Sequence, residues 1–276
     1  CFYPAISEDG RGVVFKATSA AANEVRVIHH DLQTSLGTVL TSNAWPHSWP
    51  RLSADGRFVA YEHLTNVYVW DRDTGSNVLV SVAADGTNGA NAPAHTPVMM
   101  SDAQKVLFLS GASNLVAEVA NGVWQIHARD LHHNTTTLVS VGASGQPNTR
   151  ALDIFPPSIS RDGRQVAFET PDDTLVPHDV NLAQDVFLHD LESGSTRLIS
   201  ERHPQLVPTT GAALSAVELN GLSADGTQLA FTTVDSNLAP GDTNGWQDAF
   251  VQDLRTGAIT PLSVESNGQF TAAHEL

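Results

Sequence analysis

The chain has 276 residues, enough to bury a substantial core in one large domain or two small ones. Its 14 Lys and Arg residues against 30 Asp and Glu residues give a net charge of −16, which argues against binding to a nucleic-acid backbone. The single cysteine, Cys1, excludes an internal disulfide. No apolar run reaches the roughly 18 residues needed for insertion into a membrane.

The first feature along the chain is a seven-residue pattern, P-x-x-S-x-D-G, that returns twice unchanged and twice with substitutions. It begins as PAISEDG and continues as PRLSADG, PVMMSDA, PSISRDG and NGLSADG. Six residues after each turn acid stands an aromatic residue that closes a short β-branched run such as VVF or VAY. A D-G pair between such runs predicts two strands joined by a tight turn. The turn acids are Asp9, Asp55, Asp102, Asp162 and Asp225, and the aromatics are Phe15, Tyr61, Phe108, Phe168 and Phe231.

A second acid follows in every repeat, in segments such as HDLESG and QDLRTG. Most of these segments precede another strand-like run, so each repeat predicts strand, turn, strand, variable loop, strand, turn, strand. The position of the acids at hairpin starts indicates that they cap turns rather than form a ring of catalytic carboxylates. These acids are Asp31, Asp71, Asp130, Asp190 and Asp253.

Five repeats of four antiparallel strands, without helical periodicity between them, predict an all-β fold, a β-propeller of four-stranded blades. We expect one propeller domain over residues 1–276. Its blades span approximately residues 1–45, 46–92, 93–152, 153–214 and 215–276. The five blades could close a ring by themselves or belong to a larger ring, and both arrangements stay open.

Two segments, PSISRDGRQVAF (Pro157 to Phe168) and DVFLHDLESG (Asp185 to Gly194), resemble the PD40 or TolB-like (WD40-like) propeller repeat family. The resemblance covers essentially the whole chain. It implies a protein-binding platform in the bacterial cell envelope or outside the cell, and thus a periplasmic or extracellular location. The chain opens without a Met or a signal segment, so we expect a processed product or a fragment.

Acidic loops recur in the last two blades and suggest a metal site. Asp179, Asn181 and Asp185 lie in HDVNLAQD, and Asp242, Asn244 and Asp248 lie in GDTNGWQD. Calcium prefers six to eight oxygen ligands, and D-x-N spacing lets alternate side chains turn toward one centre. Trp246 stands where an EF-hand loop has its third oxygen ligand. The alternative is that these side chains cap the loop through hydrogen bonds to backbone N–H groups. Calcium is the one cofactor that the sequence suggests.

The long variable loops, around residues 110–123, 171–184 and 234–247, indicate where a ligand would bind. Trp45, Trp49 and Trp246 could offer stacking faces for a sugar or peptide, or pack between blades. We expect a non-enzymatic binding platform for a protein or carbohydrate ligand. The alternatives are a propeller hydrolase or lyase with a central-funnel site, or the non-catalytic propeller of a larger peptidase. No catalytic residue is predicted, since no nucleophile elbow is present and Glu218 is the only acid on the expected innermost strands.

Overall fold

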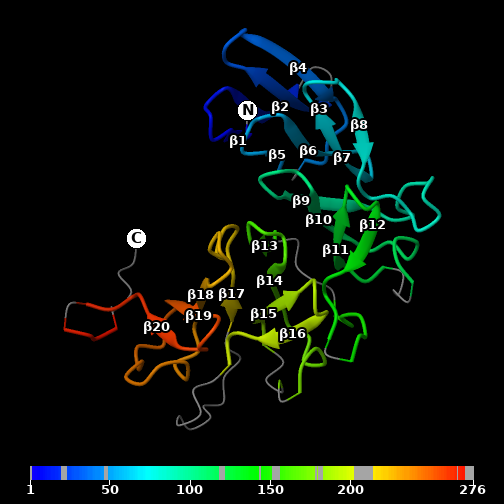
Figure 1. Cartoon of the computed structure of the whole chain (residues 1–276). Helices are drawn as coiled ribbons and strands as arrows, with labels where there is room; N and C mark the ends of the chain where they lie inside the picture. Colours follow the sequence, from blue (N-terminus) through cyan, green and yellow to red (C-terminus); the bar gives the residue numbers. More distant parts are fainter. Residues whose placement is uncertain are drawn as a thin grey trace. The chain divides into compact units, whose positions relative to one another are not determined.

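The computed structural model describes residues 2–19, 24–46, 49–117, 122–142, 144–150, 156–177, 179, 183–201, 214–265 and 267–270. Within these ranges every regular element is a β-strand, which confirms the all-β class (Figure 1). The strands form five four-stranded sheets, and in each sheet the strand order follows the order along the chain. All neighbouring strands are antiparallel, as short hairpin connections require. The described part of the chain contains no helix long and apolar enough to cross a membrane.

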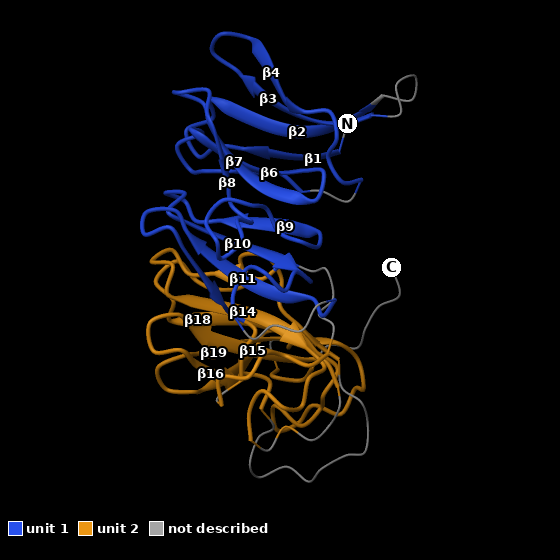
Figure 2. Ribbon diagram, turned by 90° about the vertical axis from the view of Figure 1, so that its right-hand side faces the viewer, with its two compact units in different colours: residues 1–139, 154–156 blue, residues 140–153, 157–276 orange. Residues whose placement is uncertain are grey.

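The chain divides into two compact units, which Figure 2 colours blue and orange. Unit 1 comprises residues 1–139 with 154–156, and unit 2 comprises residues 140–153 with 157–276. Each unit is described below by itself. The five blade limits within one propeller domain therefore stay a prediction.

Unit 1 contains the first three sheets, or blades. Blade one consists of β1 (Phe2–Ile6), β2 (Gly12–Ser19), β3 (Glu24–Asp31) and β4 (Leu36–Thr41). Blade two consists of β5 (Arg51–Leu52), β6 (Phe58–His63), β7 (Asn66–Asp71) and β8 (Asn77–Leu79). Blade three consists of β9 (Ala94–Met99), β10 (Lys105–Ser110), β11 (Gln125–Asp130) and β12 (Thr135–Leu138). The short strand β5 lies against β1, β2 and β9, so the first strands of the three blades converge.

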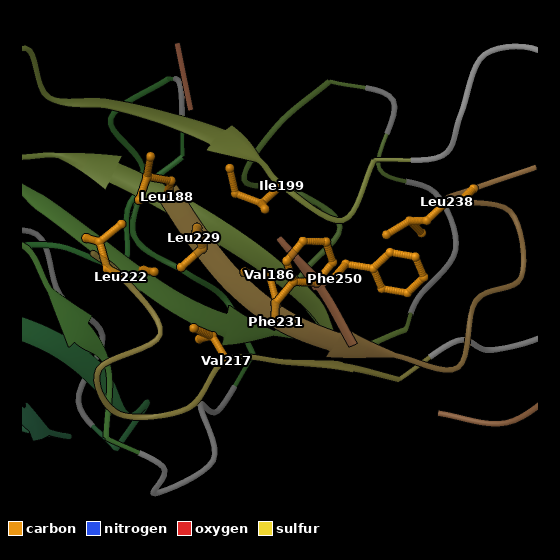
Figure 3. Packing of buried hydrophobic residues seen from close by; sticks show 11 residues of the cluster. Val186, Leu188, Ile199, Val217, Leu222, Leu229, Phe231, Leu238 and Phe250 are labelled. Carbon is orange, nitrogen blue, oxygen red and sulfur yellow. The ribbon is translucent and has the colours of Figure 1, made fainter. Parts of the chain in front are cut away.

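Unit 2 contains the last two blades. Blade four consists of β13 (Ser158–Ile159), β14 (Gln165–Thr170), β15 (Asp185–Asp190) and β16 (Ser195–Leu198). Blade five consists of β17 (Ser215–Ala216), β18 (Gln228–Thr233), β19 (Asp248–Asp253) and β20 (Ile259–Pro261). Its core includes Leu229, Phe231 and Phe250 from β18 and β19, together with Leu238 from the loop between them (Figure 3). Burying each such side chain contributes about 1.5–3 kcal/mol.

The two repeated turns have the structural role that the sequence predicts. In the first turn the motif serine donates to the following acid, as Ser7 Oγ does to Asp9 Oδ1 at 2.5 Å and Ser53 Oγ to Asp55 Oδ1 at 2.6 Å. In the second turn the acid accepts two backbone N–H groups, as Asp190 Oδ1 does from Glu192 and Ser193. The five strand-end acids are therefore turn caps, which leaves no reason to treat them as a catalytic ring.

Aromatic rings stack across the second and third strands of four blades. The centroids are 5.4 to 6.1 Å apart in the pairs Tyr61–Tyr68, Phe108–His127, Phe168–Phe187 and Phe231–Phe250. His127 is fully buried in this column and is therefore a core residue. The repeated aromatic thus fixes one face of each blade, and the residue after it points to the opposite face.

Candidate functional site

The position after the repeated aromatic carries the least expected side chains of unit 1. In blades one and two it is occupied by Lys16 on β2 and Glu62 on β6, which are only 2% and 1% exposed. Charged side chains are almost never so completely buried unless they are paired. In blade three the same position holds an ordinary apolar residue, Leu109. The two charged residues therefore depart from the repeat and call for partners.

Glu62 finds its partners on β9 of the next blade. Its Oε1 accepts the backbone N–H of Thr96 at 2.8 Å, and its Oε2 lies 3.0 Å from His95 Nδ1. Thr96 has a left-handed backbone, with φ of 55°, beside a register shift in the pairing of β9 with β10. Such a conformation is unusual for a β-branched residue and is typical of strained functional sites. The irregularity presents both the Thr96 N–H and the His95 ring to Glu62.

Part of this arrangement is shared with unit 2 and part is not. Glu169 on β14, the counterpart of Glu62, accepts the backbone N–H of Val217 at 3.2 Å. A glutamate that accepts a backbone N–H from the first strand of the following blade therefore occurs in both units and has a structural role. The register places Ala216 where unit 1 has His95, because Ala216 pairs with Thr232 as His95 pairs with Leu109. The Glu62–His95 pair is thus the unrepeated part.

His95 lies between two indole rings. Its centroid is 4.8 Å from that of Trp45 and 5.5 Å from that of Trp124. His95 is buried, whereas Trp45 is 45% exposed. One face of the site is therefore an accessible aromatic ring that covers a buried imidazole held by a carboxylate.

Lys16 extends the same site toward β1. Its Nζ donates to the carbonyl of Pro46 and lies 4.7 Å from the centroid of the Tyr3 ring. Burial lowers the pKa of Lys16, and the charge of Glu62 opposes this shift. Tyr3 is exposed, and its φ of 53° marks a second register shift, in β1. We call Tyr3, Lys16, Trp45, Glu62, His95 and Trp124 the aromatic–polar cluster.

The structure separates the three tryptophans proposed as stacking faces. Trp45 belongs to the aromatic–polar cluster, and half-buried Trp49 lies beside it, with its ring 5.7 Å from that of Tyr3. Trp246 is exposed on the β18–β19 loop of unit 2. Sequence reasoning therefore found the aromatic edge of the cluster and missed Lys16, Glu62 and His95. The signal for Lys16 and Glu62 was a charge directly after the repeated aromatic, where a strand residue is expected to be buried, and His95 on β9 carries no such signal.

The acidic loops of unit 2 contain buried carboxylates. In blade five, Asp248 Oδ1 accepts Ser263 Oγ at 2.5 Å, and Asn244 Oδ1 accepts the backbone N–H of Trp246 at 2.8 Å. In blade four, Asp179 and Asp185 are buried, and Asp185 Oδ1 accepts Ser200 Oγ at 2.6 Å. Asn181 lies outside the described residues. Among the described residues, no group of three or more His, Cys, Asp and Glu side chains could hold a metal ion.

Comparison with known proteins identifies the fold. No family model matches the chain, and no curated protein matches it. Among solved structures, an oligogalacturonate lyase in complex with manganese is similar over 94% of this chain and 64% of its own, with a TM-score of 0.61 and 18% identity. The β-propeller domain of the Trilobed protease from Pyrococcus furiosus is similar over 94% and 69%, with a TM-score of 0.54 and 14% identity.

TolB from Acinetobacter baumannii is similar over 97% of this chain, with a TM-score of 0.50 and 15% identity. The chain spans 55% of the length of that TolB and 64% of that of the lyase. These similarities, together with the five four-stranded antiparallel sheets, confirm the predicted β-propeller fold. At such low identity they show the fold alone.

Proposed function

We propose that the chain is a binding propeller that holds a carbohydrate ligand at the aromatic–polar cluster, without catalysing a reaction. The observation that carries this proposal is the contact between the exposed ring of Trp45 and the buried ring of His95. Glu62 holds the His95 ring in place. Ligand sites in proteins combine apolar and aromatic walls with a few fixed polar groups. The exposed faces of Trp45 and Tyr3, with the polar groups of the cluster below, have this composition.

A carbohydrate fits the cluster better than a flat apolar partner does. The C–H face of a sugar ring packs on an indole or phenol ring, and its hydroxyl groups need donors and acceptors close by. Lys16 and Glu62 are buried and already paired with neighbouring strands, so they hold the cluster in place, and the exposed Tyr3 carries a hydroxyl group that can donate to or accept from a sugar hydroxyl. One propeller of similar fold is an oligogalacturonate lyase, so the fold is compatible with a saccharide ligand.

Titration of the protein with a panel of oligosaccharides, followed by tryptophan fluorescence and calorimetry, tests this proposal. Trp45→Ala should weaken the binding of any saccharide that binds by about tenfold or more, because a stacked aromatic anchor typically contributes about 1–2 kcal/mol or more. Trp246→Ala, which changes an exposed indole of unit 2, is the matched control and should bind normally. Loss of binding in the control alone would move the site to the β18–β19 loop. Failure of every saccharide to bind would overturn the proposal.

A second candidate is a lyase, and one observation favours it. Lys16, Glu62 and His95 are buried acid–base groups in one cluster, and burial lowers the pKa of Lys16. Mass spectrometry of the bound saccharide over time distinguishes the two functions. An unchanged saccharide supports binding alone, whereas cleavage that Glu62→Gln abolishes supports the lyase.

The proposal also includes membership in the TolB-like family and a periplasmic or extracellular location. The TolB and Trilobed protease propellers share this fold, which supports membership in the TolB-like family and also fits the propeller of a larger peptidase. A periplasmic or extracellular location follows from the TolB-like resemblance and is checked by fractionation of cells that express the complete gene.

A further inference from the structure

The β18–β19 loop of unit 2, residues 234–247, carries a pair of carboxylates that the carbohydrate proposal does not use. Leu238 and Ala239 anchor this loop, since both belong to the hydrophobic cluster around Phe250. Figure 3 shows Leu238 beside the Phe250 ring. Asp242 follows this anchor, and Asp248 begins β19. The two side chains are only 7% and 2% exposed, so the fold directs both carboxylates inward.

Each of these carboxylates has one oxygen that is buried without a hydrogen-bond partner. The atoms are Asp242 Oδ1 and Asp248 Oδ2. The other oxygen of Asp248 accepts the hydroxyl of Ser263. Buried polar atoms in native proteins nearly always have a partner, which can be a protein group, a water molecule or an ion. These oxygens belong to residues six positions apart, close enough for the charge of Asp248 to act on Asp242, and they therefore indicate a ligand that both contact.

The electrostatics of the loop point to a cation as that ligand. Burial, together with the negative charges of Asp248 and Asp235, raises the pKa of Asp242. The ion pairs among the described residues include neither Asp242 nor Asp248. No positive side chain in the described part of the chain thus forms an ion pair with either carboxylate, and a divalent cation would balance both charges.

We propose that Asp242 and Asp248 bind a calcium ion through their unpartnered oxygens. Calcium accepts six to eight oxygen ligands in irregular geometry, and backbone carbonyl groups and water can supply the ligands that side chains do not. Magnesium demands a nearly ideal octahedron, and zinc prefers nitrogen and sulfur ligands, which this loop lacks. The proposal is independent of the carbohydrate site, which lies in unit 1.

The loop of blade four provides a comparison. Asp179 and Asp185 have the same spacing as Asp242 and Asp248, and both are buried. A calcium response of the wild-type protein could therefore include a contribution from blade four. The experiment must consequently locate the ion as well as detect it.

Thermal unfolding in calcium and in chelator is the first measurement. At calcium concentrations about 100 times the dissociation constant, the wild-type Tm should rise by roughly 5 °C or more. Asp242→Asn should lower this shift, because it removes a charged ligand. In chelator it should unfold at the same temperature as the wild type or higher, because it removes the repulsion from Asp248. Glu201→Gln, which removes an exposed charge from unit 2, should keep the wild-type response.

Terbium luminescence locates the ion. Trp246 lies in the same loop, and its backbone N–H donates to Asn244 Oδ1. Its indole ring should sensitise the emission of terbium bound in place of calcium. Asp242→Asn with Asp248→Asn should abolish this emission, and excess calcium should displace it. Trp246→Phe should abolish the emission while keeping the calcium-dependent Tm shift. Equal calcium shifts in the wild type and the double variant, or an equal shift with magnesium at the same concentration, would overturn the proposal.

Discussion

His127 stands on β11 where other blades place Tyr68, Phe187 and Phe250 opposite the repeated aromatic of the second strand. It is fully buried and stacks on Phe108, and neither ring nitrogen has a hydrogen-bond partner. Burial lowers its pKa to about 4. The fold therefore tolerates a polar ring at this position only while the ring is neutral.

The first prediction concerns the pH dependence of stability. As the pH falls from about 6.5 to about 4, the unfolded chain binds a proton at His127 that the native state does not, so native stability decreases through that window by about 3 kcal/mol. His127→Phe should remove this contribution and add about 1–2 kcal/mol at neutral pH by eliminating unpaired polar atoms. Urea unfolding of both proteins at several pH values measures the difference. If the stability difference between wild type and His127→Phe is the same at pH 7 and at pH 4.5, the assignment is contradicted.

The S-x-D-G turn is the element that repeats most faithfully, and it also joins neighbouring blades. Gly10 and Gly56 occupy the same place in this turn in blades one and two, with φ of 69° and 66°. A Cβ at Gly10 would meet nothing within 4 Å. A Cβ at Gly56 would lie 3.0 Å from Ser7 Cβ, in the corresponding turn of blade one. One glycine is thus needed for its backbone alone, and the other also for the approach of two blades.

The second prediction uses these glycines as a matched pair. Gly10→Ala should cost about 1–2 kcal/mol, which is the cost of a left-handed conformation for a residue with a Cβ. Gly56→Ala should cost about 1–3 kcal/mol more, because the added methyl group crowds Ser7. Chemical denaturation of the two variants measures the difference between them. If Gly10→Ala and Gly56→Ala destabilise the protein equally, the turns of blades one and two can move apart at little cost, which contradicts the prediction.

On the scale of the whole molecule, local repetition made the fold predictable. Strand-like runs and both turn acids recur in each blade, and the first turn acid is followed by Gly in four of the five, so five sheets and their strand order follow from the sequence. The acidic loops were also visible, because Asp242, Asn244 and Asp248 lie within seven residues. Which of their oxygens are buried without a partner depends on the fold of the loop around Leu238, and no sequence pattern shows it.

The aromatic–polar cluster was not predictable for a different reason. Lys16, Glu62 and His95 come from three blades and are separated by more than thirty residues each. They meet because β5 lies against β1, β2 and β9, and because the left-handed Thr96 turns its N–H toward Glu62. A one-residue irregularity in a strand leaves no reliable trace in a propensity pattern. Sequence patterns therefore predict the scaffold better than the contacts between blades.

The last prediction follows from the net charge of −16. Self-repulsion among so many acids destabilises the native state, and salt screens it over a Debye length of about 10 Å at 0.1 M. In the presence of chelator, Tm should rise by about 2–5 °C between low salt and a few tenths molar NaCl. Glu8→Lys with Glu201→Lys changes the charge by four, from −16 to −12, at exposed positions of units 1 and 2. This variant should respond less to salt, because less repulsion remains to be screened. The same salt response in both proteins would mean that the acids are compensated locally, through the turn hydrogen bonds of residues such as Asp190, rather than by the bulk electrolyte.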